Sequence, residues 1–154
     1  MSDIITIGQV EAVVFSELQT GKVEARIDTG ARTSAIWADN CLKEADGLKV
    51  TFFGPGSALY TGQAIKFTEF AKTVVASSNG AAQRRYKVRL LVVIGGRRMR
   101  AWFTLADRSQ QVYPVLIGRN VLRGKFVVDV KKQSKNLHKL EEKRSRLLRQ
   151  ELAE

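Results

Sequence analysis

The residues best suited to chemistry in this chain of 154 form one short motif, Asp28-Thr29-Gly30-Ala31, directly after an extended run at 23–27. A carboxylate that ends a strand can act as a general acid or base. Asp-Thr-Gly is also good turn chemistry, because Asp bonds to nearby backbone groups and Gly adopts turn conformations. A surface turn is therefore the alternative interpretation of this motif when it is considered alone.

A second motif lies late in the chain, where residues 115–122 read VLIGRNVL. The order of the two motifs, D-T-G-A and then apolar-apolar-Gly-Arg-Asn, resembles that of the retropepsin-like aspartic proteases. The segment IDTGARTSAI at 27–36 is more narrowly similar to the bacterial family labelled putative ATP-dependent zinc proteases. The resemblance covers residues 5–130 and implies the retropepsin fold.

The resemblance implies catalytic roles for Asp28, Thr29 and Gly30. An aspartic protease needs two carboxylates that share one proton, because the ionised one activates water while the protonated one polarises the carbonyl. Since the chain has one D-T-G, the resemblance predicts a homodimer in which Asp28 faces its own copy. The residues expected to support the catalytic loop from behind are Ile117, Gly118 and Arg119.

A retropepsin also needs a flap, which is a hairpin that covers the substrate and excludes water. The candidate is 74–86, because an Asn-Gly pair near its middle is a strong signal for a tight turn. An ordinary hairpin is the alternative on local sequence. The residues expected to bind substrate, in the flap and after D-T-G, are Ala31, Arg32, Ser78, Asn79, Gly80, Arg84 and Arg85.

The net charge of +11 is concentrated late in the chain. Residues 70–106 carry eight basic and no acidic side chains, and residues 131–154 carry eight basic and four acidic ones. A localised basic field attracts polyanions, whereas the alternative is a solvated face. Members of the resembled family are associated with enzymes that add glutamates to a ribosomal protein. The expected partner is thus an acidic, glutamate-tailed ribosomal protein, with the basic tail contacting the ribosome or RNA.

Metal and cofactor motifs are missing from the sequence. One cysteine, Cys41, and one histidine, His138, supply neither a disulfide framework nor the usual ligands of a zinc site. The sequence also lacks a phosphate-binding loop. We therefore expect no cofactor, although the family label mentions zinc and ATP. The sequence has no apolar run of about 18 residues and no secretory leader, so we expect a cytoplasmic protein with no membrane contact.

The elements that must position these residues are mostly strands. Short runs of β-branched and aromatic residues between turn residues are typical of a sandwich or barrel, and the Gly-Gly pair at 95–96 predicts a hairpin. We expect a short helix at 119–123 and a basic surface helix at roughly 134–152. With the resemblance added, the predicted fold is all-β, a retropepsin-like acid-protease barrel at 1–130 followed by a basic helical tail at 131–154.

The main alternative to a protease is a non-catalytic binding module, which would use the same fold and its basic surface to dock on RNA or the ribosome. Such a module does not need Asp28, and its affinity falls steeply with salt. One departure from the retroviral pattern is Arg32, which stands where those enzymes usually carry Asp, so that Arg119 lacks its usual partner. A cation at this place favours acidic side chains in a substrate.

Overall fold

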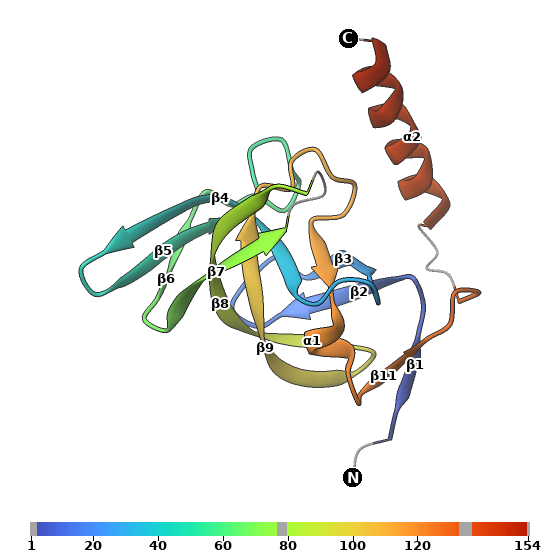
Figure 1. Cartoon of the computed structure of the whole chain (residues 1–154), viewed down its shortest axis with the longest axis horizontal. Coiled ribbons are helices and arrows are strands. Elements are labelled where there is room, and N and C mark those ends of the chain that lie inside the picture. Colours follow the sequence, from blue (N-terminus) through green and yellow to red (C-terminus); the bar gives the residue numbers. More distant parts are fainter. Residues whose placement is uncertain (1–2, 77–79, 133–136, 154) are drawn as a thin grey trace.

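The computed structural model describes residues 3–76, 80–132 and 137–153 (Figure 1). Within these ranges the chain forms eleven strands and two helices. The strands are β1 (Ile5–Ile7), β2 (Val10–Phe15), β3 (Lys22–Ile27), β4 (Ser34–Glu44), β5 (Gly47–Phe52), β6 (Ala64–Phe67), β7 (Phe70–Ala76), β8 (Ala82–Ile94), β9 (Arg97–Ala106), β10 (Val115–Ile117) and β11 (Phe126–Val128). The helices are α1 (Arg119–Leu122) and α2 (Leu137–Ala153).

Six of the strands close into a barrel. Their order is β10–β3–β2–β8–β9–β4, and β4 completes the ring by pairing with β10 through Ala35 and Ile36. β10 runs parallel to β3, and β4 runs parallel to β9, whereas the other neighbours in the ring are antiparallel. This closed barrel confirms the predicted fold class, and it inserts β10 between the two strands that flank the Asp-Thr-Gly motif.

The alternation of side chains along each strand fills the barrel. In β3, the buried side chains are Val23, Ala25 and Ile27, and the residues between them lie on the other face. Phe15 of β2 and Phe103 of β9 are fully buried and meet edge to face, with ring centroids 5.2 Å apart. The apolar interior therefore fixes which residues of β3 face outward. Arg26 is one of them, and Asp28 comes two residues later, just past the end of the strand.

Several segments extend beyond the barrel ring (Figure 1). β5 and β6 continue from β4 as an antiparallel arm, and β7 pairs along β8. β1 and β11 form a separate parallel two-stranded ribbon, which brings the two ends of the barrel domain together. α2 follows this ribbon in the chain and carries the C-terminus.

The observed elements differ from the predicted ones in detail. Residues 64–76 contain two strands, β6 and β7, which pair with different partners. The short helix lies at its predicted place and ends before Gly124, whose φ of 74° suits glycine. The tail helix begins at Leu137, and the first residues predicted for it, 134–136, lie outside the described residues.

Candidate active site

Asp28 lies just past the end of β3, in a loop held by backbone hydrogen bonds. Its amide donates to the carbonyl of Ile117 over 2.9 Å, so β10 fixes the start of the loop. Its Oδ1 accepts a hydrogen bond from the amide of Gly30 over 2.9 Å. A Cβ at Gly30 would lie 3.3 Å from that same oxygen, closer than most real contacts. Glycine therefore gives the carboxylate room beside its own loop.

Gly118 packs directly against the far side of this loop. A Cβ at Gly118 would lie 2.3 Å from the carbonyl oxygen of Thr33 and 2.9 Å from that of Ala31. The next residue, Arg119, donates its amide to the Ala31 carbonyl over 2.8 Å. Only a residue without a side chain fits between these backbones. The Gly-Arg motif is thus a backbone clamp on the segment that follows Asp28.

A buried serine connects the two motifs. Ser34 Oγ donates to Asn120 Oδ1 over 2.7 Å and accepts from the Gly118 amide over 2.9 Å. Asn120 Nδ2 in turn donates to the carbonyl of Trp102 over 2.9 Å. The sequence analysis assigned no role to Ser34 or Asn120. Ser34 lies in the apolar start of β4 and is fully buried. A buried hydroxyl needs a hydrogen-bond partner, and this need is the signal that could have pointed to Asn120.

Arg119 bonds to the Asp28 loop within the same chain. Its Nη1 donates to the carbonyl of Thr29 over 3.1 Å. In the retroviral pattern this arginine pairs with a carboxylate, whereas here its guanidinium bonds to a backbone oxygen. Arg32, at the position of that carboxylate, is exposed, and its carbonyl accepts from the amide of Asn120 over 3.2 Å.

A cavity of about 670 Å³ opens beside Asp28. Its walls come from the Asp28 loop, the β7–β8 hairpin, the segment after β9, and α2. Of the predicted site residues, the lining includes Asp28, Ala31 and Arg85. The predicted site residues that do not line it are Thr29, Gly30, Arg32, Gly80, Arg84, Ile117, Gly118 and Arg119. Ser78 and Asn79, at the predicted flap tip, lie outside the described residues.

Three arginines line the cavity together with Asp28, namely Arg26, Arg85 and Arg108. Burial is the main cause that lowers the pKa of Arg108 to about 10, and the positive charges of Arg85 and Arg26 contribute to the lowering. Burial also lowers the pKa of Arg85. The sequence analysis did not place Arg26 or Arg108 in the site. The signal for Arg26 is its position two residues before Asp28, because a strand repeats every second residue.

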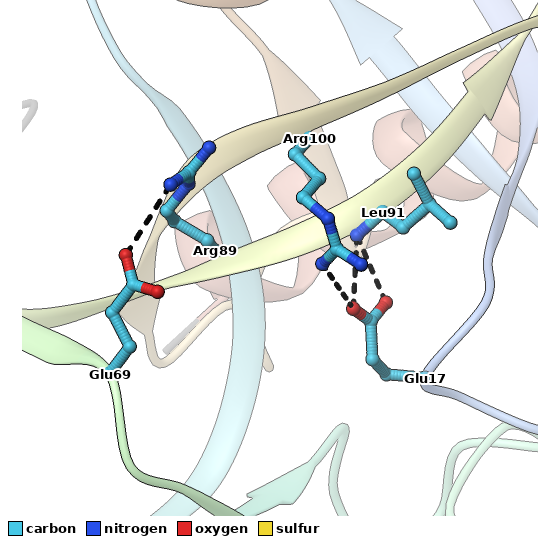
Figure 2. A network of polar contacts seen from close by, with 5 residues as sticks. All are labelled: Glu17, Glu69, Arg89, Leu91 and Arg100. Carbon is cyan, nitrogen blue, oxygen red and sulfur yellow. Dashed lines mark hydrogen bonds and ion pairs between the residues drawn. The ribbon is translucent and has the colours of Figure 1, made fainter.

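Two other arginines of β8 and β9 pair with glutamates (Figure 2), and these four side chains line a second cavity. Arg89 lies 3.4 Å from Glu69, and Arg100 lies 3.7 Å from Glu17. Glu17 also accepts the amide of Leu91 at 3.0 and 3.1 Å through its two oxygens. Acidic residues from the first part of the chain therefore offset part of the basic segment at 70–106.

The donor set does not fit a zinc site. Among the residues that the structure describes, no three His, Cys, Asp or Glu side chains come together where they could hold a metal ion. Cys41 is half-buried on β4, and burial raises the pKa of its thiol to about 11. A neutral thiol is a poor metal ligand. In the same described ranges, no helix has the length and apolar character needed to cross a membrane.

Comparisons with known proteins agree with this architecture. A Legionella pneumophila protein of unknown function, Lpg0085, has a solved structure that matches with a TM-score of 0.66 over 86% of this chain and 98% of that one, at 20% identity, which shows a shared fold. A probable alpha-L-glutamate ligase of Shewanella pealeana is 31% identical over 128 residues. A ligase of the same name from Shewanella halifaxensis is 30% identical over 128 residues.

These two alignments cover 80% of this chain but only 28% of each ligase, so the chain spans less than a third of the length of these curated relatives. A family model named RimB-like, with the description retropepsin-like aspartic endopeptidase RimB, matches residues 6–138. That match runs from β1 through both motifs and into α2, and it confirms the resemblance first suggested by those motifs. The chain belongs to the RimB-like family of retropepsin-like aspartic endopeptidases.

Proposed function

We propose that this protein is an aspartic endopeptidase that works as a homodimer and hydrolyses peptide bonds in an acidic protein segment. The observation that carries the proposal is the placement of Asp28, whose carboxylate lines a cavity large enough for a peptide while its loop is clamped by Ile117 and Gly118. A rigid loop that presents a carboxylate to a cavity is what general acid–base catalysis needs.

In the proposed reaction, two Asp28 side chains from two copies share one proton. Like charges at close range cannot both ionise easily, so one carboxylate is ionised and the other protonated. The ionised one takes a proton from water, which attacks the peptide carbonyl, and the protonated one donates to the carbonyl oxygen. As the resulting diol collapses, the carboxyl that took a proton from water gives it to the amine, the other carboxylate takes a proton from one diol hydroxyl, and the C–N bond breaks.

The second carboxylate is proposed to come from another copy because the other described acidic groups in the cavity are poorly suited. Asp107 is exposed, and hydrogen bonds from Ser109 hold its pKa below the ordinary value. Glu151 is exposed on α2. Apolar side chains exposed on or beside the β1–β11 ribbon offer a surface for a second copy: Ile4 (60%), Val127 (53%) and Val130 (65%).

The proposed substrate is an acidic chain in the cytoplasm, such as the glutamate tail of a ribosomal protein. The basic segment at 70–106 and the three arginines of the cavity attract carboxylates. The curated relatives are named as glutamate ligases, so a matching segment occurs in proteins whose names indicate glutamate addition. In this proposal residues 1–130 form the protease domain, and the tail at 131–154 contacts the ribosome or RNA.

The proposal is tested with a quenched fluorescent peptide that contains a run of glutamates. Asp28→Asn should abolish hydrolysis with the fold and oligomeric state unchanged, because Asn Oδ1 can still accept from the Gly30 amide while the side chain cannot ionise. Specific activity should also fall on dilution below the dimer dissociation constant. Full activity of Asp28→Asn, or an active monomer by ultracentrifugation, would refute the mechanism.

A non-catalytic binding module is the second candidate. It is favoured by the match to a segment that makes up 28% of larger proteins named as ligases, where the segment need not catalyse anything itself. In that case Asp28→Asn would leave function intact. Salt-sensitive RNA binding by a chain that hydrolyses no acidic peptide would favour this candidate.

A further inference from the structure

The cavity beside Asp28 holds three arginines that the proposed hydrolysis does not use. We infer that Arg26, Arg85 and Arg108 form a carboxylate-binding subsite that selects an acidic side chain of the bound peptide. The inference rests on the proposed peptidase function, and it assigns the selectivity of that function to named residues. It also differs from the expectation of the sequence analysis, which placed this selectivity on Arg32, Arg84 and Arg85.

The three arginines come to one cavity from three different parts of the fold. Arg26 lies on the outward face of β3, two residues before Asp28, and both line the cavity. Arg85 lies on β8, opposite Thr73 of β7, in the hairpin that forms one wall. Arg108 follows β9, and its Nε donates to the carbonyl of Tyr113 over 2.9 Å. Convergence of this kind places three cations around one volume beside the catalytic carboxylate.

None of the three has an ion-pair partner among the residues that the structure describes. Two other acidic side chains line the cavity, but Asp107 is exposed and bonded to Ser109, and Glu151 is exposed on α2. The contrast with Arg89 and Arg100, which are paired with Glu69 and Glu17, is direct (Figure 2). The fold pairs Arg89 and Arg100 with glutamates, whereas the guanidinium groups in the cavity form no salt bridge with a described residue and have Asp28 as the nearby carboxylate.

Repulsion between these cations is visible at Arg108. Burial is the largest cause that lowers its pKa, the charges of Arg85 and Arg26 lower it further, and the charge of Asp28 raises it; at about 10 the group is still protonated at neutral pH. Gathering like charges in a half-buried place destabilises the folded chain, and a bound anion removes that repulsion. A carboxylate is the matching ligand, because a guanidinium donates two parallel hydrogen bonds to it.

The rest of the cavity wall suits a peptide. Three glutamines line it, Gln83, Gln110 and Gln111, and their amide groups can both donate to and accept from a peptide backbone. Arg85 Nε is engaged with Gln83 over 2.8 Å, which leaves the terminal nitrogens of its guanidinium for a ligand. Because Asp28 lines the same cavity, the selected acidic side chain lies close to the bond that is cut.

The test measures binding apart from hydrolysis. In the full-length Asp28→Asn protein, fluorescence anisotropy compares a labelled oligoglutamate peptide with an oligoglutamine peptide of the same length. Arg26→Gln and Arg85→Gln should each weaken oligoglutamate binding about tenfold and leave oligoglutamine binding unchanged. Arg108→Lys, which keeps the charge but loses the planar fork, should weaken it as well. The control is Arg98→Gln, since Arg98 is exposed on β9 and lies outside the cavity lining.

The outcomes separate the subsite from the peptidase. Equal affinity for the two peptides, or equal effects of Arg26→Gln, Arg85→Gln and Arg98→Gln, would overturn the subsite. Selective oligoglutamate binding by a protein that hydrolyses nothing with Asp28 intact would support the subsite and overturn the peptidase. Loss of oligonucleotide affinity in Arg26→Gln and Arg85→Gln, with peptide affinity unchanged, would overturn the subsite in favour of a nucleic-acid site.

Discussion

The α-carbon of Gly118 lies so close to Thr33 that a methyl group there would come within 2.3 Å of the Thr33 carbonyl oxygen. Gly118→Ala should therefore push the Asp28 loop away from β10. We expect a loss of about 2 kcal/mol or more in the free energy of unfolding, as for overpacked sites, and a large loss of activity. Urea unfolding and peptide hydrolysis measure the two effects.

The comparison variant is Gly96→Ala, at a turn with φ of 81° and open space around the glycine. It should cost about 1 kcal/mol from backbone strain and leave activity unchanged. A Gly118→Ala protein as stable and active as the natural one would show that the clamp on Thr33 is not needed.

Ser34→Ala should loosen the link between the two motifs. It removes the acceptor of the Gly118 amide, which is buried, and the donor to Asn120, which is exposed. An unsatisfied buried group costs about 1–3 kcal/mol, so the midpoint of urea unfolding should fall and kcat should drop with it. Ser145→Ala, on the exposed face of α2, is the matched change and should do neither. An unchanged midpoint in Ser34→Ala would mean that water replaces the hydroxyl.

Arg84 and Arg85 are adjacent, yet only Arg85 lines the cavity. Arg85→Gln should raise KM for an acidic peptide about tenfold with little change in kcat, and the effect of Arg84→Gln should be much smaller. The KM difference should shrink as salt rises, because exposed charges are screened over about 10 Å at 0.1 M. Equal changes of KM in the two variants would mean that the overall positive charge of β8 attracts the peptide, rather than a contact inside the cavity.

Removal of metal ions should leave peptide hydrolysis unchanged. The described side chains offer no cluster of three metal-binding groups, and the proposed reaction uses carboxylates alone. Protein dialysed against a strong chelator should keep its turnover while its metal content falls to background. Loss of turnover that zinc alone restores would contradict this expectation.

Cys41 should react slowly with alkylating reagents in the folded protein. Burial raises its thiol pKa from 9.0 to about 11, so the reactive thiolate is about 100-fold scarcer near pH 8 than in an unfolded chain. The rate should stay low until the pH approaches 11, and urea should restore it at pH 8. Mass spectrometry of iodoacetamide-treated protein follows both. Fast labelling of the native protein would show that β4 opens in solution.

The barrel, and the place of Asp28 just after a strand, could be predicted because both depend on local signals. The two motifs have a fixed order, and the strands of the barrel alternate clearly, as β3 does. β4 could not be predicted in this way, because its outer half at 39–44 carries polar and charged residues on a projecting arm. Its inner half pairs with β9 and β10, which are distant in sequence, and its outer half pairs with β5 across a short turn.

The arginine subsite shows the same limit. Arg26 could be read from the two-residue repeat before Asp28, but Arg108 is brought into the cavity by the turn after β9. The sequence analysis also counted the charge of 70–106 as one field. Pairing of Arg89 with Glu69 and of Arg100 with Glu17 depends on the folded chain, so local charge counts could not separate these paired arginines from those of the cavity.

The insertion of β10 between β3 and β4 has a consequence for how the protein is made. Residues 115–117 must be present before the ring can close, so β3 and β4 each keep an unpaired edge until this part of the chain has been synthesised. Pairing between such distant segments folds slowly. The Asp28 loop gains its Ile117 and Gly118 contacts only at that moment. Emerging chains therefore lack the backbone contacts that hold the Asp28 loop until residues 115–118 have joined the barrel.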